Sequence, residues 1–253
     1  MKKSTKIIKK ILSKFALDKN LRLESRRFLS NNFCISDNNN KIILVKDGIE
    51  TTISNIEELY KINTFSYCNI NIIGSNNTLK INLPTNLNNF SINCSSNFVN
   101  IEIGQNCTLR DSSTIVWGGG GGENASMIKF GGDCSIWKNF NLFVSSSSSF
   151  IMEDDCMVSY GVTIWCGDGH QVLNRNNNQI INVQKEPLVI GKHSWISNNV
   201  LITKNAKIPP NTIIGMGSVV SKKFTEEYTC IAGNPAQVVK HNIDWTRKNI
   251  YEK

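Results

Sequence analysis

The sequence predicts an all-β solenoid with a triangular cross-section, and an internal repeat is the main observation behind this fold class. From Ile190 the chain divides without a gap into six hexapeptides, IGKHSW, ISNNVL, ITKNAK, IPPNTI, IGMGSV and VSKKFT. Each begins with a bulky aliphatic residue and carries a small residue at position five, with Phe224 as the exception. A six-residue period matches neither the 3.6-residue period of a helix nor the two-residue alternation of a strand. We therefore expect each hexapeptide to form one flat side and three to form a coil. The position-one residues should stack inside, and the small position-five residues should turn the corners.

The same frame extends toward the N-terminus. It runs through IGQNCT and LRDSST over 103–114, through FGGDCS, IWKNFN and LFVSSS over 130–147, and through MEDDCM, VSYGVT and IWCGDG over 152–169. The runs WGGGGGENAS and SSSS interrupt the frame. Glycine-rich and serine-rich interruptions between periodic segments predict loops that bulge from the coils.

The chain outside this frame completes the expected organisation. Residues 1–40 form an N-terminal helical segment, because lysines and arginines alternate there with Ile7, Ile8 and Ile11 at helical spacings. Residues 41–100 contain short β-branched runs such as KIILV and predict irregular β coils. The main solenoid covers 101–225 with a polar loop excursion at 168–187, and residues 226–253 form a C-terminal cap.

Composition narrows the class of protein. The net charge of +8 suits an anionic partner. The basic residues cluster mainly at the chain ends, without a nucleic-acid-binding signature, so we expect no nucleic-acid partner. No apolar run approaches the roughly 18 residues of a membrane span or the pattern of a secretory signal, which predicts a cytoplasmic protein. The eight cysteines form no CxxC pair and are expected to be reduced and mostly buried.

Together, the repeat, GDGHQVLN, IGKHSWIS and the closing IAGNPAQVVK resemble hexapeptide-repeat acetyltransferases over about residues 100–243. The likeness is to the branch that O-acetylates capsular and lipopolysaccharide sugars. The resemblance implies a left-handed parallel β-helix, a catalytic role for 101–225, acetyl-CoA as co-substrate, and a homotrimer with active sites between neighbouring solenoids. The acceptor would be a polysaccharide or sugar.

The same fold includes carbonic-anhydrase-like zinc enzymes, which use three histidine ligands, typically with an HxxxxH pair. This chain has only His170, His193 and His241, and it has no such pair. We therefore predict no metal site.

Acetyl transfer to a hydroxyl needs a base, and the resemblance places His170 in that role. A neutral imidazole can accept the proton near pH 7. Asp168 either orients this ring or bonds its own turn. The resemblance also makes Trp195 a catalytic candidate, because it matches a tryptophan of the acceptor and pantetheine cleft. His193 falls on an outward position and is expected to be structural or cleft-lining. A covalent route through Cys166 lacks a base partner.

The resemblance also implies a CoA site formed by small residues and lysines. Small residues let pantetheine lie against the backbone, and lysines meet the phosphates as point charges. The residues carried over are Asn198, Gly215, Met216, Ser218, Ser221, Lys222 and Lys240. The chain departs from the family where Ser197 stands in place of the usual Gly and Gln237 in place of an arginine found in some relatives. In the excursion, Arg175 and Lys185 are candidate contacts for an acidic acceptor.

Other functions remain open. A sugar N-acetyltransferase would use the same histidine, and a non-catalytic solenoid scaffold would keep the fold without the chemistry. A serine O-acetyltransferase normally carries a long helical N-terminal domain, for which about 30 helix-like residues are too few.

Overall fold

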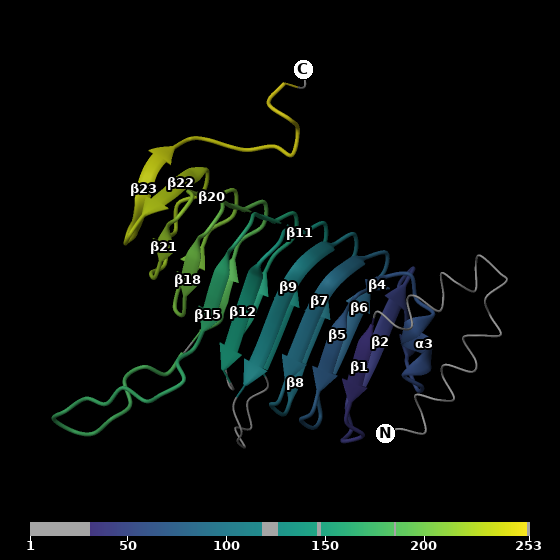
Figure 1. Ribbon diagram of the computed structural model, residues 1–253. Helices are drawn as coiled ribbons and strands as arrows, with labels where there is room; N and C mark the ends of the chain where they lie inside the picture. The colour runs from purple at the N-terminus through teal and green to yellow at the C-terminus, as the bar shows by residue number, and fades with distance from the viewer. Residues whose placement is uncertain (1–30, 118–125, 146–147, 185, 252–253) are drawn as a thin grey trace.

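The computed structural model describes residues 31–117, 126–145, 148–184 and 186–251. These residues form a parallel β-helix whose strands stack into three long sides (Figure 1). The chain passes from the first side to the second and then to the third before it begins the next coil. The predicted β-solenoid is confirmed.

Seven parallel strands build the first side, namely β2 (Lys41–Lys46), β6 (Thr78–Asn82), β8 (Val99–Ile103), β10 (Ser126–Phe130), β13 (Phe150–Met152), β16 (Leu188–Ile190) and β19 (Lys207–Ile208). The second side contains β4 (Phe65–Ser66), the first residues of β7 (Asn86–Cys94) and β9 (Thr108–Trp117), then β11 (Ser135–Ile136), β14 (Met157–Val158), β17 (Trp195–Ile196) and β20 (Ile213–Ile214). The third side contains β1 (Asn32–Ile35), β5 (Asn69–Ile72), the remainder of β7 and β9, β12 (Phe140–Ser145), β15 (Thr163–Cys166), β18 (Leu201–Thr203) and β21 (Val219–Val220).

The strand register matches the hexapeptide frame. Val189 pairs with Lys207, and Leu201 pairs with Val219, so each residue lies beside the one three hexapeptides further on. Every position-one residue from Ile190 to Val220 is fully buried, and the position-five residues are buried too, including Phe224. The interior therefore consists of stacked aliphatic columns, in which each coil buries the apolar face of the next.

Position four of the hexapeptides turns the corners, and the expectation that position five does so was wrong. His193, Asn199, Asn205 and Asn211 all have φ between 52° and 66°, and Gly217 has φ 69°. This left-handed region disfavours most L-residues and is entered most readily by Gly, Asn, Asp and His. The asparagines and glycines between the strands are therefore required by the backbone.

The two ends of the solenoid differ from the expectation in one respect. Residues 1–30, where most of the N-terminal helical segment was predicted, lie outside the described residues. Within 31–40 the prediction was wrong, because β1 pairs in parallel with β5 instead of forming helix. At the other end, β22 (Thr229–Gly233) joins β20 and forms an antiparallel hairpin with β23 (Ala236–His241).

The segment over 41–100 continues the same stack. Leu79 pairs with Ile101, and Ile70 with Ile92, in parallel. Two elements are added here, the strand β3 (Ile49–Thr52), which is antiparallel to β2, and the short helix α3 (Glu57–Tyr60).

The interruptions of the frame fall between the third side and the first. Trp117 and Ser126 were expected in a loop, but Trp117 is the last residue of β9 and Ser126 the first of β10. Strand pairing with β12 and β8 explains this, because both residues find backbone partners there. The largest interruption, between β15 and β16, projects away from the coils (Figure 1).

All eight cysteines are free, and six of them are buried, as the sequence predicted. Among the described residues, no helix has the length and apolar character needed to cross a lipid bilayer.

The corner conformation predicts the outcome of a substitution at Asn199. Asn199→Val places a β-branched residue at positive φ and should reduce the free energy of unfolding by about 1–2 kcal/mol, whereas Asn199→Gly should leave it nearly unchanged. Urea unfolding of the two variants beside the wild type measures the difference. Equal stability of the Val and Gly variants would contradict this account of the corners.

Candidate active site

His170 lies where the chain leaves the third side. The strand β15 ends at Cys166, and the chain then enters the excursion, in which Leu173 and Ile180 form an antiparallel bridge. The imidazole of His170 is exposed and makes no hydrogen bond with any residue that the structure describes. Its ring is therefore free to contact a substrate.

Two adjoining hollows meet at His170. The larger has a volume of about 660 Å³ and is bounded by the excursion base and by the ends of β15, β18 and β21. It is lined by Trp165, Gly167, Asp168, Gly169, His170, Val172, Thr203, Lys204, Asn205 and Ser221. The smaller, of about 330 Å³, lies under the excursion and shares residues 167–170.

A polar clamp holds the base of the excursion. Asp168 forms an ion pair with Lys204 and accepts a hydrogen bond from Asn182 Nδ2 at 2.6 Å. The same Asn182 amide donates to the His170 carbonyl oxygen at 2.8 Å, and Lys204 Nζ donates to the Asn182 carbonyl oxygen at 2.8 Å. The hydrogen bond from Lys204, with that from Asn182, lowers the pKa of Asp168. The Asp168 carboxylate contacts Lys204 and Asn182, and it holds the backbone at His170 through Asn182.

Trp195 lies on the second side, in β17, whereas the His170 hollow opens on the edge between the third and first sides. Its indole is half-buried, and Nε1 donates to Ser159 Oγ at 3.2 Å. The sequence predicted that Trp195 and His170 belong to the same kind of site. Within one chain, the structure places the two residues on different sides of the solenoid.

A C-terminal latch, formed by Asp244, Trp245 and Arg247, docks beside Trp195. The Trp245 ring stacks on His193 at a centroid distance of 4.5 Å and lies 6.2 Å from the Trp195 ring. Trp245 Nε1 donates to the His193 carbonyl oxygen at 2.9 Å, and Arg247 Nε donates to Asp155 Oδ1 at 3.0 Å. The latch therefore covers the outer surface next to Trp195.

His193 is the centre of this latch. Its ring nitrogens lie 2.6 Å from Asp155 Oδ2 and 3.2 Å from both Asp244 Oδ1 and the Trp245 carbonyl oxygen. Burial acts to lower the pKa of His193, but the hydrogen bonds to Asp155 and Trp245 and the nearby acidic charges outweigh it and raise the pKa. For Asp155, burial acts to raise the pKa, and the contacts with His193 and Arg247 outweigh it and lower the pKa.

The predicted CoA residues fall into two groups. Ser221 lines the His170 hollow, and Lys222 follows it, with Nζ donating to Gln237 Oε1 at 2.7 Å. Asn198 and the exposed Met216 lie at the opposite edge of the third side, Asn198 in the turn between β17 and β18 and Met216 in the turn between β20 and β21. Lys240 is exposed on β23.

Ser218 has a different environment. Its side chain is fully buried, its hydroxyl donates to the Gly215 carbonyl oxygen at 2.6 Å, and it accepts from the Gly233 N–H at 3.1 Å. This side chain serves the corner of the coil and is not accessible to a ligand.

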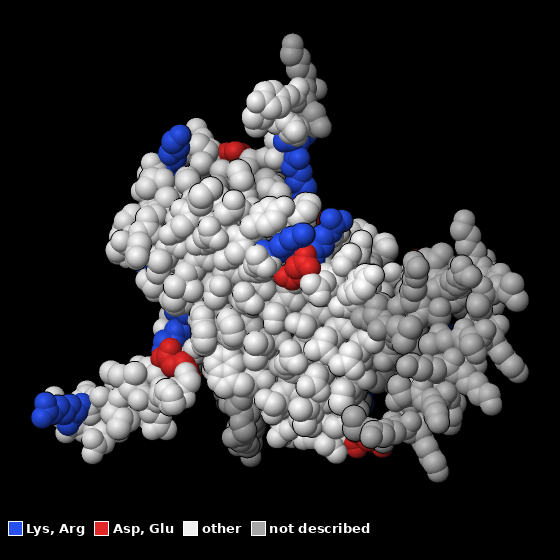
Figure 2. All heavy atoms as spheres, in the orientation of Figure 1, with Lys and Arg blue, Asp and Glu red and all other residues white. Residues whose placement is uncertain are grey.

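The two candidate acceptor residues are not brought to His170. Arg175 lies in the turn at the tip of the excursion, where Asn178 N–H donates to the Asn174 carbonyl oxygen at 2.8 Å, and it lines neither hollow. Figure 2 shows one basic side chain at the far end of this projection. Lys185 lies outside the described residues.

Sequence reasoning missed Lys204, Asn182 and Trp165. Lys204 occupies position three of ITKNAK, an outward position that by itself only indicates a solvated lysine, and Asn182 lies in a segment without any repeat. Trp165 is outward on β15, and its presence beside His170 follows from the frame. Within the described residues, no three His, Cys, Asp or Glu side chains come close enough together to hold a metal ion.

The raised pKa of His193 predicts how pH affects the latch. Protonated His193 stabilises the folded state fully below its unfolded-state pKa of about 6.5, and this contribution is lost as the pH rises through the higher folded-state value. The stability of the wild type relative to His193→Gln should therefore decline as the pH is raised above about 6.5. Urea unfolding at a series of pH values measures this difference in the free energy of unfolding, with His241→Gln as the control. Parallel stability curves for the wild type and His193→Gln would contradict the prediction.

The sequence of the chain is similar to those of characterised acetyltransferases. No protein-family model matches it. A polysialic acid O-acetyltransferase of Neisseria meningitidis is 30% identical over 190 residues, covering 69% of this chain and 88% of that protein. A polysialic acid O-acetyltransferase of Escherichia coli O1:K1 / APEC is 27% identical over 122 residues, covering 48% of this chain and 39% of that protein.

The solved structure of the polySia-specific acetyltransferase NeuO superposes with a TM-score of 0.62 at 21% identity, covering 89% of this chain and 93% of that one. This likeness shows the fold, which is a left-handed parallel β-helix. The coils, the repeat and the sequence similarity agree, and the chain therefore belongs to the hexapeptide-repeat acetyltransferase family, whose enzymes transfer acetyl groups from acetyl-CoA.

Proposed function

We propose that this enzyme O-acetylates a hydroxyl group of a bacterial capsule or lipopolysaccharide sugar, with His170 as the general base. Two relatives that act on polysialic acid support the class of acceptor. The observation that carries the proposal is the exposed imidazole of His170 at the edge of a 660 Å³ hollow, on a backbone that the Asp168 clamp holds. A hollow of this size lies within the range of small-molecule sites, about 300–1,000 Å³.

The proposed chemistry is a direct transfer. The His170 imidazole takes the proton of the acceptor hydroxyl as its oxygen attacks the thioester carbonyl carbon. The new C–O bond forms, the C–S bond breaks, and the proton passes from His170 to the departing CoA sulfur. The Asp168, Asn182 and Lys204 contacts fix the backbone at His170 and so limit the positions that the ring can reach.

The residues present fit CoA. Gly217 leaves open space where a Cβ would stand, and Met216 beside it is 69% exposed, so an extended pantetheine can approach the backbone there. Lys222 and Lys240 are exposed cations for the phosphates. Lys223 is paired with Glu186 at 2.6 Å, which makes it the weaker candidate.

We also propose a homotrimer, because the two groups of site residues lie on different edges of one solenoid. In a closed three-fold ring, one edge of each chain faces another edge of its neighbour. His170, Ser221 and Lys222 of one copy would then share a cleft with the partner subunit's Trp195, Asn198 and Met216.

Replacing the base tests the function. His170→Ala should reduce acceptor-dependent release of CoA thiol by about 10²–10⁴-fold, while the affinity for CoA stays unchanged. Thiol release from acetyl-CoA is measured with a panel of surface polysaccharides, their monosaccharides and amino sugars, with His241→Ala as the control. Full activity of His170→Ala would assign the base elsewhere, and transfer to amines alone would favour N-acetylation.

Mixing two inactive variants tests the shared cleft. His170→Ala and Trp195→Ala each lack one half of every cleft, but random mixed trimers restore a complete cleft at about a quarter of the sites. Refolding equal amounts of the two together should therefore recover about a quarter of the wild-type activity. Sedimentation establishes that all samples are trimers. Trimeric mixtures without any recovery would show that both residues act within one chain.

A further inference from the structure

The third side differs from the first in its charge. On the first side, outward Lys80 pairs in register with Glu102, and Glu102 with Lys129. On the third side, one outward row runs through Asn32, Asn69, Ser91, Ser113, Asn141 and Thr163. The neighbouring row runs through Cys34, Asn71, Asn93, Ile115, Phe143 and Trp165. Neither row contains a charged residue, and the surface over β9 and β12 shows few charged side chains in Figure 2.

An aromatic patch, formed by Trp117, Phe143 and Trp165, lies at the end of this side next to His170. The rings of Phe143 and Trp165 stack at 4.3 Å and 14°, and Trp117 meets Trp165 edge-on at 5.7 Å. Trp165 is 38% exposed and lines the His170 hollow. Trp117 and Phe143 are partly buried. Aromatic side chains gathered on the outside of a β-helix contribute nothing to its interior, so the patch and its exposed Trp165 point to a ligand.

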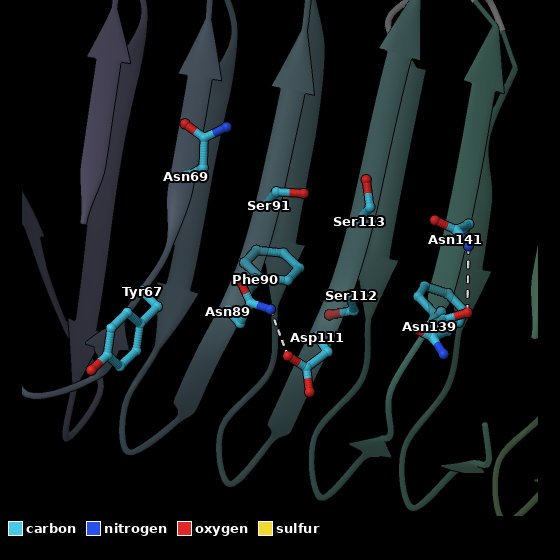
Figure 3. A pocket seen from close by; sticks show the side chains of 11 residues that line it. Tyr67, Asn69, Asn89, Phe90, Ser91, Asp111, Ser112, Ser113, Asn139 and Asn141 are labelled. Atoms are coloured by element: carbon cyan, nitrogen blue, oxygen red, sulfur yellow. Dashed lines mark hydrogen bonds between the residues drawn. The ribbon is translucent and has the colours of Figure 1, made fainter. Parts of the chain in front are cut away.

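A polar groove of about 260 Å³ continues the same side away from His170 (Figure 3). Its lining includes Tyr67, Asn69, Ser91, Ser113 and Asn141 on the strands β5, β7, β9 and β12 or beside them. Tyr67 is 64% exposed.

Asp111 also lines the groove, and its charge is already engaged. It accepts a hydrogen bond from Asn89 at 2.5 Å and lies 3.8 Å from Lys138. The groove therefore offers amides, hydroxyls, one phenol ring and the Asp111 carboxylate, which Asn89 and Lys138 already contact.

This combination fits a saccharide chain. Sugar hydroxyls pair with amides and hydroxyls, and the C–H face of a sugar ring packs on an aromatic ring. An interface with a second copy would instead bury the row of asparagines and serines, and each would then need a partner from the copy. The continuity of the aromatic patch with the His170 hollow makes the acceptor the occupant.

We propose that the third side is a binding track for the acceptor chain, running obliquely from Trp165 through Phe143 and Trp117 to the polar groove. The inference rests on the proposed function and extends it, because it makes the substrate a chain of linked sugars instead of a single sugar unit. From β15 to β5 the track crosses four strand spacings, roughly 19 Å, enough for several sugar units. Recognition uses hydroxyls and ring faces, not charge.

Binding to His170→Ala protein tests the track without turnover. Sialic acid oligomers and uncharged glucose oligomers, each from monomer to hexamer, are titrated by calorimetry and by tryptophan fluorescence. We expect one series to gain about tenfold in affinity from monomer to tetramer. A second substitution is then made in the His170→Ala protein, either Trp117→Leu or Ser113→Arg, which fills the groove. Each should remove most of the gain in affinity with length and leave the affinity for monomers unchanged. Ile151→Arg, which places the same charge on the first side, is the control.

Three results would overturn the track. The first is an affinity that is independent of oligomer length in both series. The second is a loss of affinity of more than about tenfold between about 50 mM and 500 mM salt. The third is dissociation of the protein oligomer by Ser113→Arg and Trp117→Leu, measured by sedimentation. Turnover by protein with intact His170 is followed separately. Length-dependent binding without acetyl transfer refutes the proposed function and keeps the track, whereas transfer with equal efficiency to monomers and oligomers refutes the track alone.

Discussion

The stacking of position-one aliphatic residues in the interior is the interaction on which the structure depends. A single coil has too little apolar surface to be stable, and each becomes stable only when the coils on both sides cover it. Ile190, Ile196 and Ile202, one from each side of the same coil, are fully buried in this way. Because the columns use only the inward positions, the outward positions are free to carry charge, amides or aromatic rings. Function is therefore added to the solenoid from outside, on surfaces that the core does not constrain.

The same constraint explains how the chain accommodates the excursion between β15 and β16. Thr163 pairs with Leu201 across the excursion, and Leu201 pairs with Val219 one uninterrupted coil later, so the insertion leaves the parallel register intact. Insertions between coils emerge at a corner, where the backbone already turns. His170 thus projects from a rigid wall, and the Lys204 of the next coil reaches back to fix the loop through Asp168. A rigid wall with a clamped loop positions the proposed base more narrowly than a free loop would.

A solenoid also presents long flat surfaces, which suit long substrates. The charged first side, the latch on the second side and the uncharged third side are three different surfaces built on one repeated interior. The edge between the third and first sides holds His170, and the second side holds Trp195. This division is the physical basis for the proposed cleft between copies and for the proposed track along the third side.

From the sequence alone one obtains the β-solenoid, its six-residue frame and the inward residues, because these are local and repeat along the chain. His170 and its loop also follow, since a break in a regular frame is visible without a structure. Other features depend on residues that meet only when the coils stack. These include strand β1 in place of helix, the separation of Trp195 from His170, the Asp168, Asn182 and Lys204 clamp, and the latch, in which Arg247 reaches Asp155, 92 residues earlier. The frame specifies which residues point inward, and the stacking of coils decides which outward residues become neighbours.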